Sequence, residues 1–239
     1  LRSGIGPAAE LQQSGIELIA DSPDVGNNLQ EHVDISIHVK NARRDGMTLT
    51  PFGLLKLTPA LIRYLLTKDG QLAHSLAEAG AFYRSSAAVA EPDIQLHLLP
   101  VMFNDSGYDW WPTLKHGFTC HVCLLRPRSR GKVRLNPQDP LGSPRIDYGF
   151  LTDSADQQDL LNGIRKALDI LQQPSLQHHN GGILFPRPAD DDAELLAQVR
   201  QQCGLIYHPT STCRMGADSR SVVDECLRVR GVSQLRVID

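Results

Sequence analysis

The fold is decided by FTCHVCL, residues 118–124, in which apolar side chains alternate with more polar ones. Alternation with a period of two is typical of a β-strand that turns one face to a core. The same pattern recurs outward along the chain in IQLHL at 94–98 and in ISIHV at 35–39. Further strand candidates are AFYR at 81–84, KVRL at 132–135 and RIDY at 145–148. Strands joined by turns, without a regular strand–helix alternation, predict a mostly antiparallel sheet.

Helices are expected before and after these strands in the sequence, packed on one side of the sheet. Asp153 or Ser154 caps a helix whose apolar positions fall on one face and which stops at Pro174. A second helix begins near residues 190–192 and ends before Gly204. Earlier in the chain, Pro59 is expected to open a helix. An antiparallel sheet flanked by helices makes the expected fold class α+β.

The composition limits the classes of function. The chain has 239 residues, 41% of them hydrophobic, and a formal net charge of -3 with both signs mixed along its length. Nothing in it builds a basic face for nucleic acid. No apolar run approaches the roughly 20 residues of a membrane span, because Lys56, Pro59 and Arg63 break the greasiest stretch. No signal peptide is recognised, and five irregularly spaced cysteines favour a reducing, cytoplasmic setting.

The stretch YHPTSTCRMG, residues 207–216, is the leading candidate for chemistry. His208 is held between an aromatic residue and a proline, and a turn of small and polar residues follows. These neighbours restrict the backbone around His208, so its imidazole can be held in a fixed position, as a catalytic base requires. A free imidazole titrates near ~6.5, so it can accept a hydroxyl proton at physiological pH and return it. A lone histidine is more often structural or exposed, and only its surroundings favour the catalytic interpretation.

A second stretch, VGNNLQEH at residues 25–32, lies upstream. Taken alone, its Gly and Asn residues indicate a tight turn before a strand. The nearby Gly4 and Gly6 do not form a dinucleotide fingerprint, since no strand precedes them and no third glycine follows at the right offset.

Together these stretches resemble signatures of the glucose–methanol–choline (GMC) family of flavin oxidoreductases. The first matches the C-terminal signature, and the second resembles Val-Gly-x-Asn-Leu-x-Asp-His, with Glu31 in place of the usual Asp. The resemblance implies that FAD is the cofactor and that His208 is catalytic, since it handles the hydroxyl proton while a hydride passes to the flavin. It also implies a set of cofactor-binding residues: Gly26, Asn28, Leu29, His32 and Asp239.

Two residues are candidates for substrate contact under the same resemblance. Glu78, in AEAGAF at 77–82, matches a segment beside the substrate pocket of choline-oxidising members, and its carboxylate could attract a cation. The alternative is a charge at the start of a strand. Tyr207 precedes the catalytic histidine.

The Cys-x-x-Cys pair in CHVC raises the question of a metal. In a strand, Cys120 and Cys123 point to opposite faces, and no second ligand pair stands at zinc-site spacing. Structural thiols and no metal site are therefore expected.

Within the family, IQLH at 94–97 and CHVCLLRP at 120–127 look closest to bacterial choline dehydrogenases and to alcohol dehydrogenases that use an acceptor other than oxygen. The implied reaction oxidises a primary alcohol to an aldehyde, with an alcohol and an acceptor such as a quinone as partners and a location in the cytoplasm or peripheral to the inner membrane. One alternative is choline dehydrogenase, disfavoured because only 5% of residues are aromatic. Another is a non-catalytic ligand-binding or interaction module.

The resemblance also predicts a division into domains. Residues 1–34 are expected to be a remnant of the FAD-binding domain, 35–205 the substrate-binding domain, and 206–239 the start of a C-terminal FAD-domain segment. The family's N-terminal phosphate-binding turn and its second active-site residue are not matched. The chain is therefore expected to be a truncated fragment that holds no flavin by itself.

Overall fold

The computed structural model describes residues 1–44, 46–77, 79–103 and 111–238. The chain divides into two compact units. The smaller comprises Leu1–His32, Pro127–Asp153 and Tyr207–Asp239, and the larger Val33–Arg126 and Ser154–Ile206. Residues 127–153, assigned above to the middle domain, are thus grouped with the two terminal segments.

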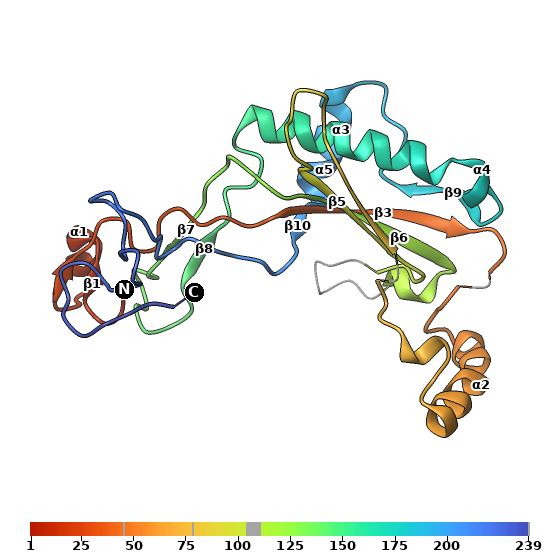
Figure 1. Ribbon diagram of the computed structural model, residues 1–239, viewed down its shortest axis with the longest axis horizontal. Helices are drawn as coiled ribbons and strands as arrows, with labels where there is room; N and C mark the ends of the chain where they lie inside the picture. Colours follow the sequence, from red (N-terminus) through yellow and green to blue (C-terminus); the bar gives the residue numbers. More distant parts are fainter. Residues whose placement is uncertain (45, 78, 104–110, 239) are drawn as a thin grey trace. The chain divides into compact units, whose positions relative to one another are not determined.

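The larger unit is built on a sheet that has six antiparallel strands among the described residues (Figure 1). Its order is β10-β3-β6-β5-β4, and β9 also pairs with β3. At its centre, the register runs from Val33 opposite Leu124 to Lys40 opposite Gly117. The strands are β3 (Val33–Asn41), β4 (Ala79–Tyr83), β5 (Ile94–Leu99), β6 (Gly117–Leu124), β9 (Asn180–Phe185) and β10 (Gly204–Leu205). The α+β class and the antiparallel sheet are confirmed.

Helix α3 (Ser154–Leu171) lies along one face of this sheet, as Figure 1 shows. It can approach closely because Gly163 has no side chain: a Cβ there would come within 2.9 Å of the Ile94 side chain. Helix α4 (Pro174–Gln177) follows it, and α5 (Asp192–Gln202) packs against α3 and β3. The Asp191 carboxylate caps α5 by accepting a hydrogen bond from the Glu194 amide at 2.8 Å.

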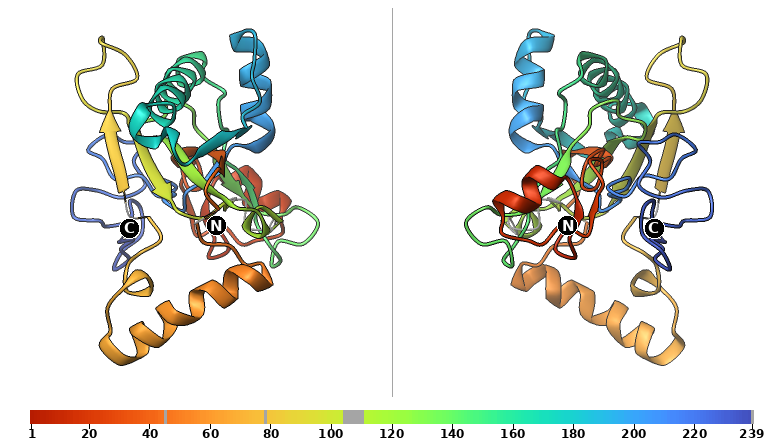
Figure 2. Two further views of the ribbon diagram at one scale, coloured as in Figure 1. Left: turned by 90° about the vertical axis from the view of Figure 1, so that its right-hand side faces the viewer. Right: turned by 90° about the vertical axis from the view of Figure 1, so that its left-hand side faces the viewer.

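Helix α2 spans Pro51–Thr67, so the prediction that Pro59 opens a helix was wrong. Thr50 is the N-cap, and its hydroxyl accepts a hydrogen bond from the Gly53 amide at 3.1 Å. Pro51 occupies the first turn, where a missing amide hydrogen costs nothing. Pro59 instead lies inside the helix, where it removes one internal hydrogen bond and leaves the remaining turns intact. Two short 3₁₀ turns are η1 (Gln71–Ala73) and η2 (Trp111–Leu114), and α2 packs mainly against η1 (Figure 2).

The smaller unit has little regular structure. Its elements are β1 (Ile5–Gly6), α1 (Ala8–Gln13), β2 (Ala20–Asp21), β7 (Lys132–Arg134) and β8 (Arg145–Asp147). β1 pairs with β2 in parallel, and β7 pairs with β8 in antiparallel. A valine cluster of Val25, Val222, Val223 and Val229 is buried within the unit, so segments from both ends of the chain share one core.

Candidate active site

The VGNNLQEH segment runs between two other parts of the smaller unit. On one side, Leu29 and Gly131 exchange backbone hydrogen bonds of 3.0 and 2.8 Å. On the other, Gln30 and Thr210 exchange bonds of 3.0 and 2.8 Å. The segment thereby fixes the loop of residues 207–212, which carries the candidate catalytic histidine and is called the histidine loop below.

Glu31 holds the histidine loop through hydrogen bonds to its backbone. Its side chain is only 3% exposed. Its carboxylate oxygens accept hydrogen bonds from the His208 amide at 3.0 and 2.8 Å, and one of them also accepts from the His32 amide at 2.9 Å. Such charge-assisted bonds offset the cost of burying a carboxylate and are stronger than neutral ones. Glu31 therefore ties together the backbones of two histidines.

The backbone around His208 is unusual. Tyr207 has φ 65° and Ser211 has φ 74°, both in the left-handed region that favours glycine. Each such residue costs of order 1–3 kcal/mol, and residues of this kind cluster at functional sites. The His208 side chain is exposed, and the Tyr207 side chain is 62% exposed. The loop thus presents the imidazole to the outside of the smaller unit rather than to its core.

His32 and His208 form an edge-to-face pair. Their ring centroids are 5.3 Å apart, with an interplanar angle of 72°. Burial, and next the neighbouring His208, lower the pKa of His32 below its ordinary value. Its Nδ1 atom is buried and makes no hydrogen bond to the part of the chain that the structure describes. Both causes favour the neutral form of the His32 imidazole.

A pH dependence of stability follows from His32. Because its pKa is lower in the folded state, the unfolded chain binds more protons below ~6.5, the ordinary histidine value. The contribution to stability is complete above that pH and is lost as the pH falls through the folded-state pKa. We expect His32→Phe to lose less stability than the wild type between pH 7.5 and 5.5, as measured by urea unfolding. His178→Phe, at an exposed position, is the control and should lose as much stability as the wild type. An equal loss in His32→Phe and His178→Phe would contradict the assignment.

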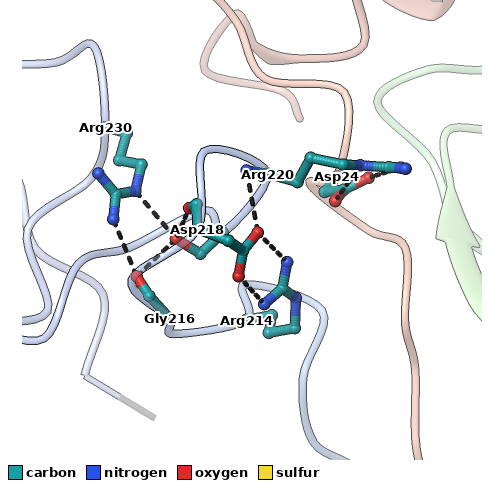
Figure 3. Close-up of polar contacts among 7 residues, drawn as sticks. Asp24, Arg214, Gly216, Asp218, Arg220 and Arg230 are labelled. Carbon is teal, nitrogen blue, oxygen red and sulfur yellow. Dashed lines mark hydrogen bonds and ion pairs between the residues drawn. The ribbon is translucent and has the colours of Figure 1, made fainter.

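Beyond the histidine loop, ion pairs secure the chain (Figure 3). The Arg214 guanidinium donates two hydrogen bonds to Asp218, at 2.7 and 2.9 Å, and holds the pKa of that carboxyl well below its usual range. Arg220 donates to Asp24 at 2.8 and 3.2 Å, which lowers the pKa of Asp24. Arg230 Nη2 donates to a carbonyl in the same turn at 2.9 Å. The two ion pairs thus stabilise the turn of residues 214–220 and attach it to the segment that contains Asp24.

The structure places most of the expected cofactor-binding residues in the VGNNLQEH segment. Gly26 has φ 80°, and a Cβ there would lie 2.3 Å from the Val133 carbonyl oxygen, so only glycine fits. Asn28 has φ 63°, and the Leu29 side chain is 3% exposed. Asp239 lies outside the described residues. That these residues bind a cofactor remains a prediction.

Only one of the two substrate candidates lies among the described residues. Tyr207 adjoins His208 in the histidine loop. Glu78 lies outside the described residues, immediately before β4 begins at Ala79. Both roles remain predictions.

The larger unit contains a buried polar network that the sequence pattern did not indicate. Across β3 and β6, His121 Nδ1 lies 2.7 Å from Asp34 Oδ2, and the Cys123 thiol donates to Asp34 Oδ1 at 3.2 Å. Ser36 Oγ lies 3.3 Å from the same His121 nitrogen. All of these side chains are buried. The strand register explains the network, because it sets Asp34 opposite Cys123 and Ser36 opposite His121.

Strand β6 places the two cysteines of CHVC on opposite faces of the sheet. Cys123 belongs to the polar network, while Cys120 stands opposite Ile37 and Leu98. Burial raises the pKa of Cys120 to about 12, which keeps it a thiol. Within the described ranges, no three His, Cys, Asp or Glu side chains are grouped to hold a metal ion.

Comparison with known proteins places these features in a family. A family model described as GMC oxidoreductase matches residues 127–239. The alcohol dehydrogenase [acceptor] of Pseudomonas putida is 39% identical over 242 residues, covering 99% of this chain and 43% of that protein. The oxygen-dependent choline dehydrogenase of Ectopseudomonas mendocina (strain ymp) is 37% identical over 240 residues, covering 100% of this chain and 42% of that protein. The chain spans less than half the length of these relatives.

Comparison with solved structures shows the same fold in other proteins. A formate oxidase of Aspergillus oryzae RIB40 superposes with a TM-score of 0.83 at 27% identity, over 99% of this chain and 46% of that one. Pyridoxine 4-oxidase from Mesorbium loti shares the fold, with a TM-score of 0.79 at 24% identity over 100% of this chain and 42% of that one. The family model matches residues 127–239 and the relatives match the rest of the chain as well, so the chain belongs to the GMC oxidoreductase family.

Proposed function

We propose that this chain supplies the proton-handling histidine for FAD-dependent oxidation of a primary alcohol to an aldehyde, with electrons passed to an acceptor other than oxygen. The observation that carries the proposal is the mounting of His208: an exposed imidazole whose amide is held by the buried carboxylate of Glu31. The relatives named alcohol dehydrogenase [acceptor] and choline dehydrogenase support an alcohol as the substrate.

The residues present fit a flavin. The buried Nδ1 atom of His32 has no hydrogen-bond partner among the described residues, so a polar edge of a bound group would satisfy it. His208 lies beside it and is exposed. When bound, FAD supplies the two-electron acceptor for the hydride.

The part of this chain in the reaction is to move a proton. As the hydroxyl-bearing carbon loses a hydride to the acceptor, the hydroxyl O–H bond breaks and its proton passes to the His208 imidazole, which leaves a C=O double bond. The lowered pKa of His32 keeps that neighbour uncharged, so the proton gained by His208 meets no second positive charge there. Glu31 keeps the loop in place during the transfer. General-base assistance of this kind contributes roughly 10²–10⁴ in rate.

Anaerobic reduction of the flavin tests the proposal. We expect a straight-chain primary alcohol to bleach the visible absorbance of oxidised flavin in the full-length protein and to yield one aldehyde per flavin reduced. A tertiary alcohol, which has no hydrogen on the carbinol carbon, should leave the spectrum unchanged.

Two other results would replace the proposal. A higher kcat/KM for choline than for straight-chain alcohols would assign the protein to choline oxidation. Absence of both bound flavin and turnover in the full-length protein would favour a non-catalytic binding module.

A further inference from the structure

We propose that α2 docks the protein onto an anionic lipid surface, with the outer face of the helix entering the interface of the bilayer. The inference goes beyond the proposed function and depends on none of the residues assigned to it. It rests on the exposure, arrangement and charge of the α2 side chains.

The outer face of α2 is largely apolar, with the exposed Thr58 between two rows of apolar side chains. Within each row the side chains are seven and then four residues apart, so they lie along one side of the helix. Their exposed fractions run from 47% to 79%. One row holds Leu54, Leu61 and Leu65, and the other Leu55, Ile62 and Leu66. Isolated exposed leucines are ordinary, but a continuous patch of this kind marks an interaction surface.

The helix uses only a narrow stripe to contact the rest of the larger unit. Gly53 is buried, and Leu57, Ala60 and Tyr64 are partly buried. These positions recur on one side of the helix, with the row of Leu55 opposite them and the row of Leu54 about a quarter-turn away. Figures 1 and 2 show α2 standing away from the sheet, and η1 is its main neighbour. The wide apolar face is therefore turned away from the core.

The charges of α2 favour lipid over a protein partner. Residues 51–68 contain Lys56, Arg63 and Lys68 but no Asp or Glu, although the whole chain has a net charge of -3. Arg63 pairs with the nearby Asp69 at 2.8 Å. Lys56 Nζ lies 4.9 Å from the centroid of the Phe52 ring, a cation–π contact within the helix. Each cation near an anionic leaflet contributes about 1 kcal/mol.

The length of the helix indicates how it lies. Its 17 residues extend about 25 Å at ~1.5 Å per residue, less than the ~30 Å hydrocarbon core. Across the described part of the chain, no helix is long and apolar enough to cross a membrane. An apolar face bordered by cations suits a helix that lies in the plane of the interface.

Vesicle co-sedimentation tests the docking. We expect the full-length protein to sediment with vesicles of phosphatidylglycerol and phosphatidylcholine, and more weakly with phosphatidylcholine alone. The variant Ile62→Asn/Leu66→Asn should lower the partition constant at least about tenfold, because two apolar side chains no longer leave water. Leu141→Asn is the matched control, since Leu141 is 78% exposed and Leu66 79%, and it should bind like the wild type.

Other occupants of the face would give different results. If light scattering shows a dimer that the double variant splits, α2 binds a second copy and the proposal fails. If vesicles do not bind and a cysteine introduced by Leu66→Cys resists maleimide, the rest of the same polypeptide covers the face. Should the double variant not fold by circular dichroism, Lys56→Gln/Arg63→Gln decides: unchanged binding to anionic vesicles overturns the proposal.

Discussion

Replacing His208 by alanine should lower the rate of flavin reduction by the alcohol roughly 10²–10⁴-fold in the full-length enzyme. The substitution removes the only group proposed to accept the hydroxyl proton. It leaves intact the amide that donates to Glu31, because that bond uses the backbone. The loop should therefore keep its conformation and the protein its flavin. Anaerobic stopped-flow measurement of flavin reduction checks the rate, and the flavin content of the variant checks the fold.

A matched histidine separates chemistry from general damage. His178, which follows α4, is exposed, and His178→Ala should reduce the flavin at the wild-type rate. Because the His208 side chain is also exposed, imidazole added to the buffer should restore part of the activity of the alanine variant. A loss below about threefold, far under the general-base range, would remove His208 from the mechanism and favour a binding role for the chain.

Most of the sheet was predictable because its strands carry a local signal. Alternation over 35–39 and 118–124 located the two central strands, which the structure extends to β3 and β6. β9 and β10 gave no such signal. β9 contains Gly181 and Gly182, and β10 has only two residues, so the pairing of each with β3 supplies what its own pattern lacks.

The division into units was less predictable, since it depends on contacts between distant residues. The pairing of Leu29 with Gly131 carries residues 127–153 into the smaller unit. The local composition of residues 127–153 does not indicate this pairing. The α2 boundary is a different case: Thr50 and Pro51 formed a visible capping signal, which Pro59 obscured.

The candidate site was also only partly predictable, because some of its contacts join residues far apart in the sequence. The Tyr-His-Pro context identified His208 from a local stretch, but the role of Glu31 could not be inferred there. Its carboxylate reaches an amide 177 residues away, and only the fold brings the two together. The polar network of the larger unit likewise needs the register of β3 against β6, which alternation alone does not fix.

Replacing Asp34 by alanine should destabilise the protein by roughly 3–5 kcal/mol, the usual cost of removing one partner from a buried polar pair. Asp34 is 2% exposed and His121 3%, so water cannot easily take the place of the lost carboxylate. Two donors would lose their acceptor at once: His121 Nδ1 at 2.7 Å and the Cys123 thiol at 3.2 Å. Urea unfolding measures the change. As a control, Asp69→Ala breaks an exposed pair with Arg63 and should have little effect.

A double-mutant cycle shows whether the loss arises from the network itself. Combining Asp34→Val with His121→Phe replaces both partners by apolar groups, so neither is left unsatisfied. The double variant should then be more stable than the sum of the single changes predicts, by about 0.5–3 kcal/mol. Additive losses would mean that the two side chains act separately, and that the 2.7 Å contact between them contributes nothing to stability. In that case the loss caused by Asp34→Ala would come from its other contact, the Cys123 thiol at 3.2 Å.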